Sequence, residues 1–297
     1  MIFDVLIVGG GPAGLSAALV LGRCCRKVAL FDTSEPRNYV TKHIYGLLGH
    51  DTIDPAMYRK MGKEEVLRYG VKVFEKKIIK AVCENGHFAI ETAEKETFLG
   101  KKLLLATGIC DNLPGLEGFS TYYGKGVYHC PYCDGYEYHG KVLAAWGKGS
   151  EAFGLALALK GWSEEVSLFL DKNSLNTEMT TLLQKNKISV YTSKVERLEG
   201  DSERLKEIVL KDGKRLKCDA LFFVNGYQQH SDLAKMLNCR FTKKGVVHTS
   251  VKQETNINGL YVAGDAAKDM QMTIVAAAEG AKAAIAINTA LQLESWK

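Results

Sequence analysis

Two cysteines in the middle of the chain have the spacing of a redox pair. Cys130 and Cys133 form a C-x-x-C motif, and Asp134 follows the second thiol directly. Thiols at this spacing can close into a small disulfide ring, and nearby charges can hold one sulfur as a thiolate at neutral pH. A neighbouring carboxylate can carry the proton that thiol–disulfide exchange must move, although Asp is also a common helix N-cap. We therefore predict that Cys130, Cys133 and Asp134 are catalytic.

Other interpretations of the pair are structural. Two buried thiols that never react, or a zinc site completed by His129 or His139, would use the same residues, but no second C-x-x-C or H-x3-H follows at finger spacing. We predict no metal site. An imidazolium beside the pair would lower a thiol pKa, yet either histidine is equally well read as a surface residue, so neither is assigned a role. The other cysteines are interpreted as small buried hydrophobes in a reducing compartment: Cys24, Cys25, Cys83, Cys110, Cys218 and Cys239.

The elements that must position this chemistry begin at the N-terminus. An apolar strand, a glycine turn, an apolar helix and a second strand ending at Asp32 follow one another over residues 3–32. In this context G-x-G-x-x-G becomes a dinucleotide-binding motif. Gly9 permits the turn, Gly11 lets a pyrophosphate approach the backbone, and Gly14 lets the helix meet the strand. The helix N-terminus faces the phosphates, and Asp32 can bind a ribose hydroxyl.

A second strand–turn–helix–strand unit follows the cysteine pair, over residues 142–171. Its turn contains Gly147, Gly149 and Ser150, and its second strand ends at Asp171. These parts either bind a second dinucleotide or are inherited architecture without a ligand.

After this unit the chain returns to a strand that delivers Gly264 and Asp265. We therefore infer that the second domain is inserted into the first. The predicted fold class is α/β, with two Rossmann-like dinucleotide-binding domains, the second inserted into a discontinuous first domain. The expected boundaries are 1–117 and 247–297 for the first domain and 118–246 for the inserted one.

Composition indicates an ordinary soluble globular protein. The chain has 297 residues, 46% hydrophobic content and a net charge of +5, and its lysine pairs are scattered, whereas nucleic-acid binders concentrate such charge on one face. No apolar run approaches the roughly 20 residues of a membrane span. The N-terminus enters a strand directly, without the pattern of a signal peptide. We expect a cytoplasmic protein that binds neither nucleic acid nor membrane.

Taken together, these motifs resemble the low-molecular-weight thioredoxin reductases over essentially the whole chain. The matching segments are the Gly9–Gly14 turn, Ala106-Thr107-Gly108, Cys130 to Gly135, Gly147-x-Gly149, and Gly264-Asp265 before a terminal helix. The resemblance implies a discontinuous FAD domain, an inserted pyridine-nucleotide domain that carries the disulfide, and a homodimer. It also implies that Cys133 faces the flavin while Cys130 exchanges with the substrate.

Carried over residue by residue, the resemblance implies a set of FAD contacts. They lie in the first glycine turn, the Ala-Thr-Gly turn, the Gly-Asp turn and the start of the last helix: Gly9, Gly11, Pro12, Ala13, Gly14, Asp32, Thr107, Gly108, Gly264, Asp265, Thr273 and Ile274. The apolar stripe of that last helix is expected to pack within the fold and at the dimer contact.

The second nucleotide site departs from the family pattern. Reductases that use NADPH have a His-Arg-Arg run at the position of Leu170-Asp171-Lys172, and Lys148 replaces the usual middle glycine of the turn. A carboxylate at this point repels a 2′-phosphate and suits a free ribose hydroxyl. This pattern argues against NADPH and leaves NADH, a different nucleotide such as a second flavin, or an empty site.

The segment near the flavin also departs from ordinary thioredoxin reductases. Arg37 and Asn38, with the histidine that follows, resemble a branch that includes dithiol oxidases of the gliotoxin and holomycin pathways. We expect Arg37 and Asn38 to contribute to the cofactor site. Ferredoxin-dependent flavin thioredoxin reductases, which also lack a working NADPH site, are a third relative.

Three functions therefore remain open. A reductase would pass electrons to a thioredoxin-like protein or another disulfide, and ferredoxin is one donor. A dithiol oxidase would take electrons from a small dithiol and give them to oxygen. A flavin-binding redox sensor without turnover belongs to another class, and the intact C-x-x-C motif argues against it.

Overall fold

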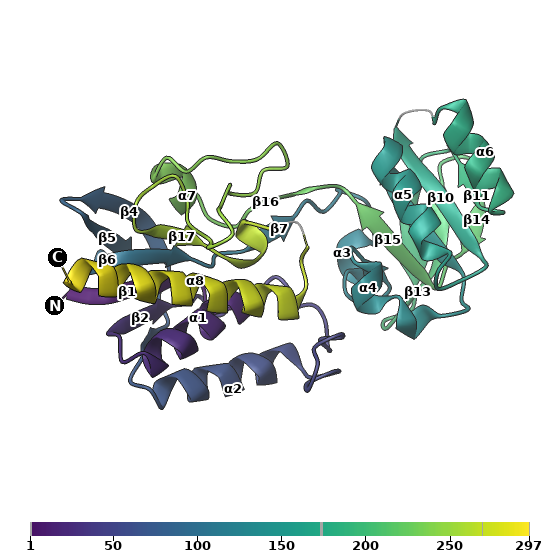
Figure 1. Ribbon diagram of the computed structural model, residues 1–297. Coiled ribbons are helices and arrows are strands. Elements are labelled where there is room, and N and C mark those ends of the chain that lie inside the picture. Colours follow the sequence, from purple (N-terminus) through teal and green to yellow (C-terminus); the bar gives the residue numbers. More distant parts are fainter. Residues whose placement is uncertain (1, 173–174, 269, 297) are drawn as a thin grey trace. The chain divides into compact units, whose positions relative to one another are not determined.

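The chain forms two compact units in the computed structural model, which describes residues 2–172, 175–268 and 270–296 (Figure 1). Unit 1 comprises Met1–Tyr39, Leu47–Cys110 and Gln228–Lys297, and unit 2 comprises Val40–Gly46 and Asp111–Tyr227. Each unit has its own sheet and its own apolar core. The two units are therefore described separately.

Unit 1 is built on a seven-stranded sheet with the order β3-β2-β1-β6-β5-β4, in which β17 also pairs with β6. The strands β1, β2, β3, β6 and β17 run parallel, whereas β4 and β5 continue the sheet in antiparallel fashion. The bounds are β1 (Ile2–Val8), β2 (Val28–Phe31), β3 (Lys72–Phe74), β4 (Ile78–Glu84), β5 (His87–Thr92), β6 (Thr97–Leu105) and β17 (Leu260–Val262).

Alternate side chains of β1 enter two different cores, because successive residues of a strand point to opposite faces. Leu6 and Val8 belong to one apolar cluster, and Val5 and Ile7 belong to the other. The sheet is thus buried on both faces, as its apolar strands require. The helices and 3-10 turns of unit 1 are α1 (Pro12–Arg23), α2 (Pro55–Leu67), α7 (Leu233–Met236), η2 (Gly264–Ala266) and α8 (Thr273–Ser295).

Helices α1 and α8 lie against each other along one face of this sheet (Figure 1). A Cβ atom at Gly280 would lie 2.0 Å from the carbonyl oxygen of Ala13. Only glycine at position 280 therefore allows α8 to approach the start of α1 so closely.

Helix α8 is long and apolar enough to cross a membrane by length and composition, contrary to the expectation that no segment approaches that length. Buried core helices pass the same test, and Ala283, Ala284 and Ile287 of α8 are fully buried against α1. The composition of α8 is explained by this packing.

Unit 2 contains a five-stranded parallel sheet with the order β11-β10-β9-β15-β8 and a separate antiparallel sheet with the order β12-β13-β14. The strands are β8 (Val127–Tyr128), β9 (Leu143–Lys148), β10 (Val166–Lys172), β11 (Ser189–Tyr191), β12 (Val195–Gly200), β13 (Leu205–Leu210), β14 (Arg215–Lys217) and β15 (Ala220–Val224). The helical elements are α3 (Phe119–Tyr122), α4 (Pro131–Asp134), η1 (Tyr136–Tyr138), α5 (Gly149–Leu159) and α6 (Thr177–Lys185).

The chain passes between the units at β7 (Ile109–Asp111) and β16 (Tyr227–Gln229), which pair as a two-stranded sheet. The boundaries expected from turn-forming residues were 117/118 and 246/247. The compact units instead change at 110/111 and 227/228. The Gly245 segment lies wholly within unit 1, where Thr242 and Val246 form a backbone hydrogen bond.

The free cysteines differ from the expectation that all are buried. Cys218 and Cys239 are buried, and Cys110 is half-buried, but Cys24, Cys25 and Cys83 are exposed. Cys24 and Cys25 follow the last turn of α1, where the chain leaves the core. The burial prediction was therefore wrong for these three residues.

Candidate redox and cofactor site

The first glycine turn has the shape expected for a phosphate cradle. A Cβ atom at Gly9 would lie 2.1 Å from the carbonyl oxygen of Ala106, and one at Gly14 would lie 1.8 Å from the carbonyl oxygen of Gly9. No heavy atom lies within 4 Å of a Cβ built on Gly11. Gly9 and Gly14 thus permit close backbone packing, while Gly11 leaves open space before α1, whose first residue is Pro12.

Asp32 lies beside this turn, at the end of β2. Its Oδ1 accepts a hydrogen bond from the backbone N–H of Gly10 at 3.2 Å. Its Oδ2 is buried without a hydrogen-bond partner among the described residues. A buried carboxylate oxygen needs hydrogen bonds or opposite charges in place of water, and the ion pairs of this oxygen leave its hydrogen-bonding capacity unused. A ribose hydroxyl would satisfy it, so the residues present fit the adenosine end of FAD.

Two cations from α2 face the same carboxylate oxygen. Lys63 Nζ lies 3.3 Å from Asp32 Oδ2, and Arg59 Nη2 lies 3.5 Å from it. Lys63 also donates to the hydroxyl of Ser34 at 3.2 Å. These residues were missed by the sequence analysis. The only sequence indication was the spacing of Arg59 and Lys63, which places both on one face of α2.

The remaining expected cofactor residues of unit 1 surround the start of α1 and α8. Gly264 has φ +76°, and a Cβ atom there would lie 3.0 Å from the Cβ of Ala13. Arg37 Nη1 lies 3.3 Å from Asp265 Oδ2 and donates to Gln271 Oε1 at 2.6 Å. Arg37 thus joins the 34–39 segment to the Gly-Asp turn.

Other members of the expected set lie on neighbouring turns. Thr107 and Gly108 follow β6, and Gly108 has φ +69°. Thr273 and Ile274 begin α8, and Asn38 follows Arg37 in the same segment. Thr107 and Gly108 therefore lie at the edge of the unit 1 sheet where the parallel strands β1, β2, β6 and β17 end.

Cys130 and Cys133 are joined as a disulfide, with their Cα atoms 5.3 Å apart. Cys130 is the N-cap of α4, and its Sγ accepts a hydrogen bond from the backbone N–H of Cys133 at 3.1 Å. Pro131 is the first residue of the helix, where its missing N–H costs nothing. The four-residue helix thus closes the disulfide ring.

Aromatic residues support this helix. Tyr132 lies between the two cysteines, is 72% exposed, and meets Trp162 edge-on with ring centroids 5.4 Å apart. A Cβ atom at Gly135 would lie 2.4 Å from the carbonyl oxygen of Pro131 and 3.0 Å from the Trp162 ring. Glycine at position 135 therefore allows the chain to turn beneath Trp162 directly after the disulfide.

Asp134 is the last residue of α4, so the N-cap interpretation does not hold for this helix, which Cys130 caps. Burial, with a smaller contribution from the neighbouring Glu137 carboxylate, raises the pKa of Asp134 to about 7. Tyr128 and Tyr138 pack nearby, with their hydroxyl oxygens 3.0 Å apart. A carboxyl group with a pKa near neutrality can both accept and donate a proton at physiological pH.

The second glycine turn is arranged differently from the first. A Cβ atom at Gly147 would lie 2.6 Å from the carbonyl oxygen of Val224, and Gly149 has φ +52° with open space around it. Asp171 Oδ2 lies 3.9 Å from Lys148 Nζ, so the acid of this unit pairs with the turn itself. Ser150 and the exposed Glu151 lie in the first turn of α5. Two carboxylates thus lie at this turn and at the start of α5.

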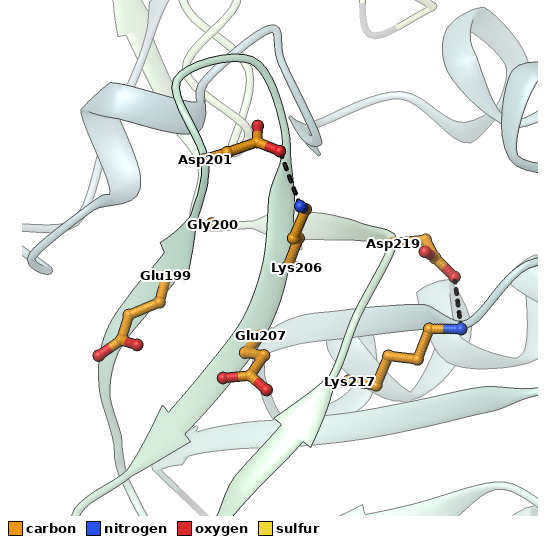
Figure 2. A pocket seen from close by; sticks show the side chains of 7 residues that line it. All are labelled: Glu199, Gly200, Asp201, Lys206, Glu207, Lys217 and Asp219. Carbon is orange, nitrogen blue, oxygen red and sulfur yellow. Dashed lines mark ion pairs between the residues drawn. The ribbon is translucent and has the colours of Figure 1, made fainter.

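A separate pocket of about 550 Å³ lies on the antiparallel sheet of unit 2 (Figure 2). It is lined by Glu199, Gly200, Asp201, Lys206, Glu207, Lys217 and Asp219. Its charges pair with one another, since Lys206 lies 2.8 Å from Asp201 and Lys217 lies 3.9 Å from Asp219. None of the expected site residues lines it. Within the described ranges, no three His, Cys, Asp or Glu residues are grouped to hold a metal ion.

Comparison with known proteins identifies the class to which this fold and this site belong. The model of the pyridine nucleotide-disulphide oxidoreductase family matches residues 3–280, and the chain belongs to this family. The chain is accordingly a flavin disulfide oxidoreductase with two Rossmann-like domains, and FAD is its cofactor.

Within this family, the chain is similar to several individual proteins. A thioredoxin reductase of Helicobacter pylori is 30% identical, over 97% of this chain and 99% of the relative. The structure of HlmI matches with a TM-score of 0.95 at 29% identity, covering 99% of this chain and 94% of that chain. TrxB from Bacillus anthracis matches with a TM-score of 0.94 at 31% identity, covering 99% of both chains. The resemblance to thioredoxin reductases and the predicted fold class are confirmed.

Proposed function

We propose that the protein exchanges electrons between FAD and the Cys130–Cys133 disulfide, and between that disulfide and a thiol or disulfide substrate. The supporting observation is a C-x-x-C disulfide directly before a carboxyl group whose pKa is raised to about 7. Bound FAD supplies the capacity to accept or donate two electrons. Cys130 exchanges with the substrate, Cys133 is the flavin-side sulfur, and Asp134 holds or releases the proton of the exchange.

The electron donor of this proposed reaction is not NADPH. The support comes from the second glycine turn, where Asp171 pairs with Lys148 and where Glu151 begins α5. Asp171 and Glu151 are both negatively charged, and each would repel a phosphate group. We propose a reductase of thioredoxin type that takes electrons from another donor, such as a ferredoxin, and acts on a thioredoxin-like protein. The same observation favours a dithiol oxidase that uses oxygen as the second candidate.

The cofactor contacts of this proposal lie in unit 1. Asp32, Arg37 and Asp265 are the charged members, and the glycine turn supplies the backbone. The buried Asp32 Oδ2 without a hydrogen-bond partner supports this assignment.

We also propose that the protein is a cytoplasmic homodimer. The exposed free thiols of Cys24, Cys25 and Cys83 suit a reducing compartment. The outer face of α8 exposes Ile285 by 61% and Leu293 by 51%, which suits a contact with a second copy. Light scattering in the presence of thiol reductant measures the assembly, and a monomeric mass would contradict the dimer.

Anaerobic titration of the FAD-loaded protein tests the direction of electron flow. Reduced ferredoxin is expected to bleach the visible flavin band, and NADPH is expected to leave it unchanged. Bleaching by a small dithiol, followed by hydrogen peroxide when air is admitted, would favour the oxidase. A band that no donor or dithiol bleaches would contradict both enzymes and favour a redox sensor. Cys133→Ser is expected to keep FAD and to lose electron transfer between flavin and thiol.

A further inference from the structure

Three side chains of unit 2 meet where the chain approaches the disulfide segment. Asp111 ends β7, Tyr123 follows α3, and His129 directly precedes Cys130. The hydroxyl of Tyr123 donates to Asp111 Oδ2 at 2.6 Å, and His129 Nδ1 lies 4.0 Å from the same oxygen. The side chain of Asp111 is 7% exposed, and that of His129 is 30% exposed.

Asp111 is thus a buried carboxylate that needs compensation. Removing an ionised carboxylate from water is costly unless hydrogen bonds or an opposite charge replace the water. The Tyr123 hydroxyl supplies one short hydrogen bond, and Tyr123 itself is 8% exposed and fixed in the apolar core of unit 2. His129 can supply a positive charge to the same carboxylate oxygen, at 4.0 Å. A carboxylate at this range favours the protonated form of an imidazole.

The helix that carries the disulfide offers no positive charge of its own. Its ionisable groups other than the cysteines and tyrosines are Asp134 and Glu137, and both are carboxyl groups. Negative charge opposes a thiolate, whereas a nearby cation stabilises it. Lys141 lies over the ring of Tyr138, 5.3 Å from its centroid. His129 directly precedes Cys130, so its imidazole is the ionisable side chain adjacent to this thiol in the chain.

We propose that Asp111 and Tyr123 hold the His129 imidazole as a cation beside Cys130, so that Cys130 more readily exists as a thiolate. Asp111 and His129 are positioning residues in this account, and the account rests on the proposed exchange at Cys130. In the reducing direction, the Cys130 thiolate attacks a substrate disulfide, forms the mixed disulfide and releases a substrate thiolate. In the oxidising direction, a second substrate thiolate attacks the substrate sulfur of the mixed disulfide, forms the substrate disulfide and releases Cys130 as thiolate.

The expected size of the effect follows from the chemistry of thiols. If the pKa of Cys130 rises by about one unit when the cation is lost, the thiolate fraction at neutral pH falls about tenfold. The more basic thiolate is also the better nucleophile, with a Brønsted slope of about 0.4–0.5, which recovers about threefold. Alkylation of Cys130 should therefore slow by about threefold.

The experiment uses the FAD-loaded protein, reduced without air and treated with limiting iodoacetamide at pH 7. Peptide 126–141 contains both thiols between two lysine cleavage sites, so fragment masses separate alkylation of Cys130 from that of Cys133. Asp111→Asn and His129→Gln are expected to slow the alkylation of Cys130 about threefold and to change the alkylation rate of Cys133 less. His139→Gln and Asp201→Asn are matched controls, since both residues are exposed and lie outside the cluster. His129→Lys supplies a permanent cation and should restore at least half of the lost rate.

The outcomes separate the proposed role of Cys130 in substrate exchange from the inference about Asp111 and His129. If wild-type Cys130 is alkylated no faster than Cys133, the proposed role of Cys130 in substrate exchange fails. If Cys130 is faster in the wild type but unchanged in His129→Gln and Asp111→Asn, the positioning inference alone is overturned. If His129→Lys is as slow as His129→Gln while both retain the wild-type unfolding temperature, charge is not the cause, and the inference is again overturned.

Discussion

The two glycine turns occupy equivalent places in the two units and differ in what their acids contact. Asp32 of the first unit accepts from its own turn through Oδ1 and faces cations from α2, a different element, through Oδ2. Asp171 of the second unit faces Lys148 of its own turn. Both acids therefore form ion pairs, but Asp32 pairs with a separate helix, whereas Asp171 pairs with a lysine of the glycine turn itself.

This difference teaches that the same glycine motif and terminal acid can stand in two different charge environments. The turn geometry is retained in both units, because glycine is needed for backbone packing whether or not a ligand binds. The charges around the acid decide what the turn can hold. In unit 2 these charges are Asp171, Lys148 and Glu151, which carry our proposal that the turn does not take NADPH.

The largest expected difference between the two turns comes from adding a methyl group at the first glycine of each one. Gly9→Ala places a Cβ 2.1 Å from the Ala106 carbonyl oxygen, and Gly147→Ala places one 2.6 Å from that of Val224. Both variants are expected to lower the free energy of unfolding by about 3 kcal/mol or more. Only Gly9→Ala should also lose FAD, measured as the flavin-to-protein absorbance ratio. Gly149→Ala, which meets no atom within 4 Å, is a control for added bulk, although its φ of +52° adds mild strain.

Replacing Asp32 and Asp171 separately tests the same comparison between the two glycine turns. Asp32→Ala removes the acceptor for a ribose hydroxyl, and hydrogen bonds to charged groups contribute about 1.5–3 kcal/mol. FAD affinity of the apoprotein should therefore fall by about tenfold to a hundredfold, measured by quenching of flavin fluorescence. Asp171→Ala should leave this affinity unchanged. Equal losses in both variants would show that the two acids are equivalent.

The pH dependence of stability tests the environment of Asp134, beside the disulfide of unit 2. The pKa of Asp134 is raised to about 7 in the folded protein, against about 4 when unfolded. Between these values the folded state binds more protons, so stability is highest at low pH and falls as pH rises through 4–7. We expect this group to contribute about 1–3 kcal/mol to the decline, in urea unfolding at each pH. Asp134→Asn should flatten the decline, and a slope that persists in this variant would assign it to other groups.

Local patterns in the sequence were sufficient to predict most of the fold. The apolar strand before Gly9 and the strand before Gly264 each deliver a turn at the end of a parallel strand, and the alternation of two Rossmann-like units follows from that repetition. The spacing of Cys130 and Cys133 is local, so the sequence could predict that they close into a disulfide, and the catalytic roles of both cysteines and Asp134 stay predictions. Contacts between distant segments were not accessible in this way.

The missed residues illustrate this limit. Lys63 reaches Asp32 only because α2 packs beside β2, and no sequence period encodes that approach. Asp111 reaches Tyr123 through the packing of α3, which the sequence analysis did not place. The exposure of Cys24 and Cys25 depends on where α1 ends, and helix ends are the least certain part of a sequence-based prediction.

The smallest expected effect concerns the pair that distinguishes the second turn. Lys148 is 52% exposed and lies 3.9 Å from Asp171, so solvent screens their attraction, and such pairs contribute about 0–1 kcal/mol. Lys148→Ala should therefore change the free energy of unfolding by less than about 1 kcal/mol and leave bound FAD unchanged. Because the variant frees the Asp171 carboxylate without adding a phosphate contact, NADPH should still fail to bleach the flavin band in an anaerobic titration. If Lys148→Ala instead gained bleaching by NADPH, the lysine would have been blocking a working site, and the two turns would differ only by that one side chain.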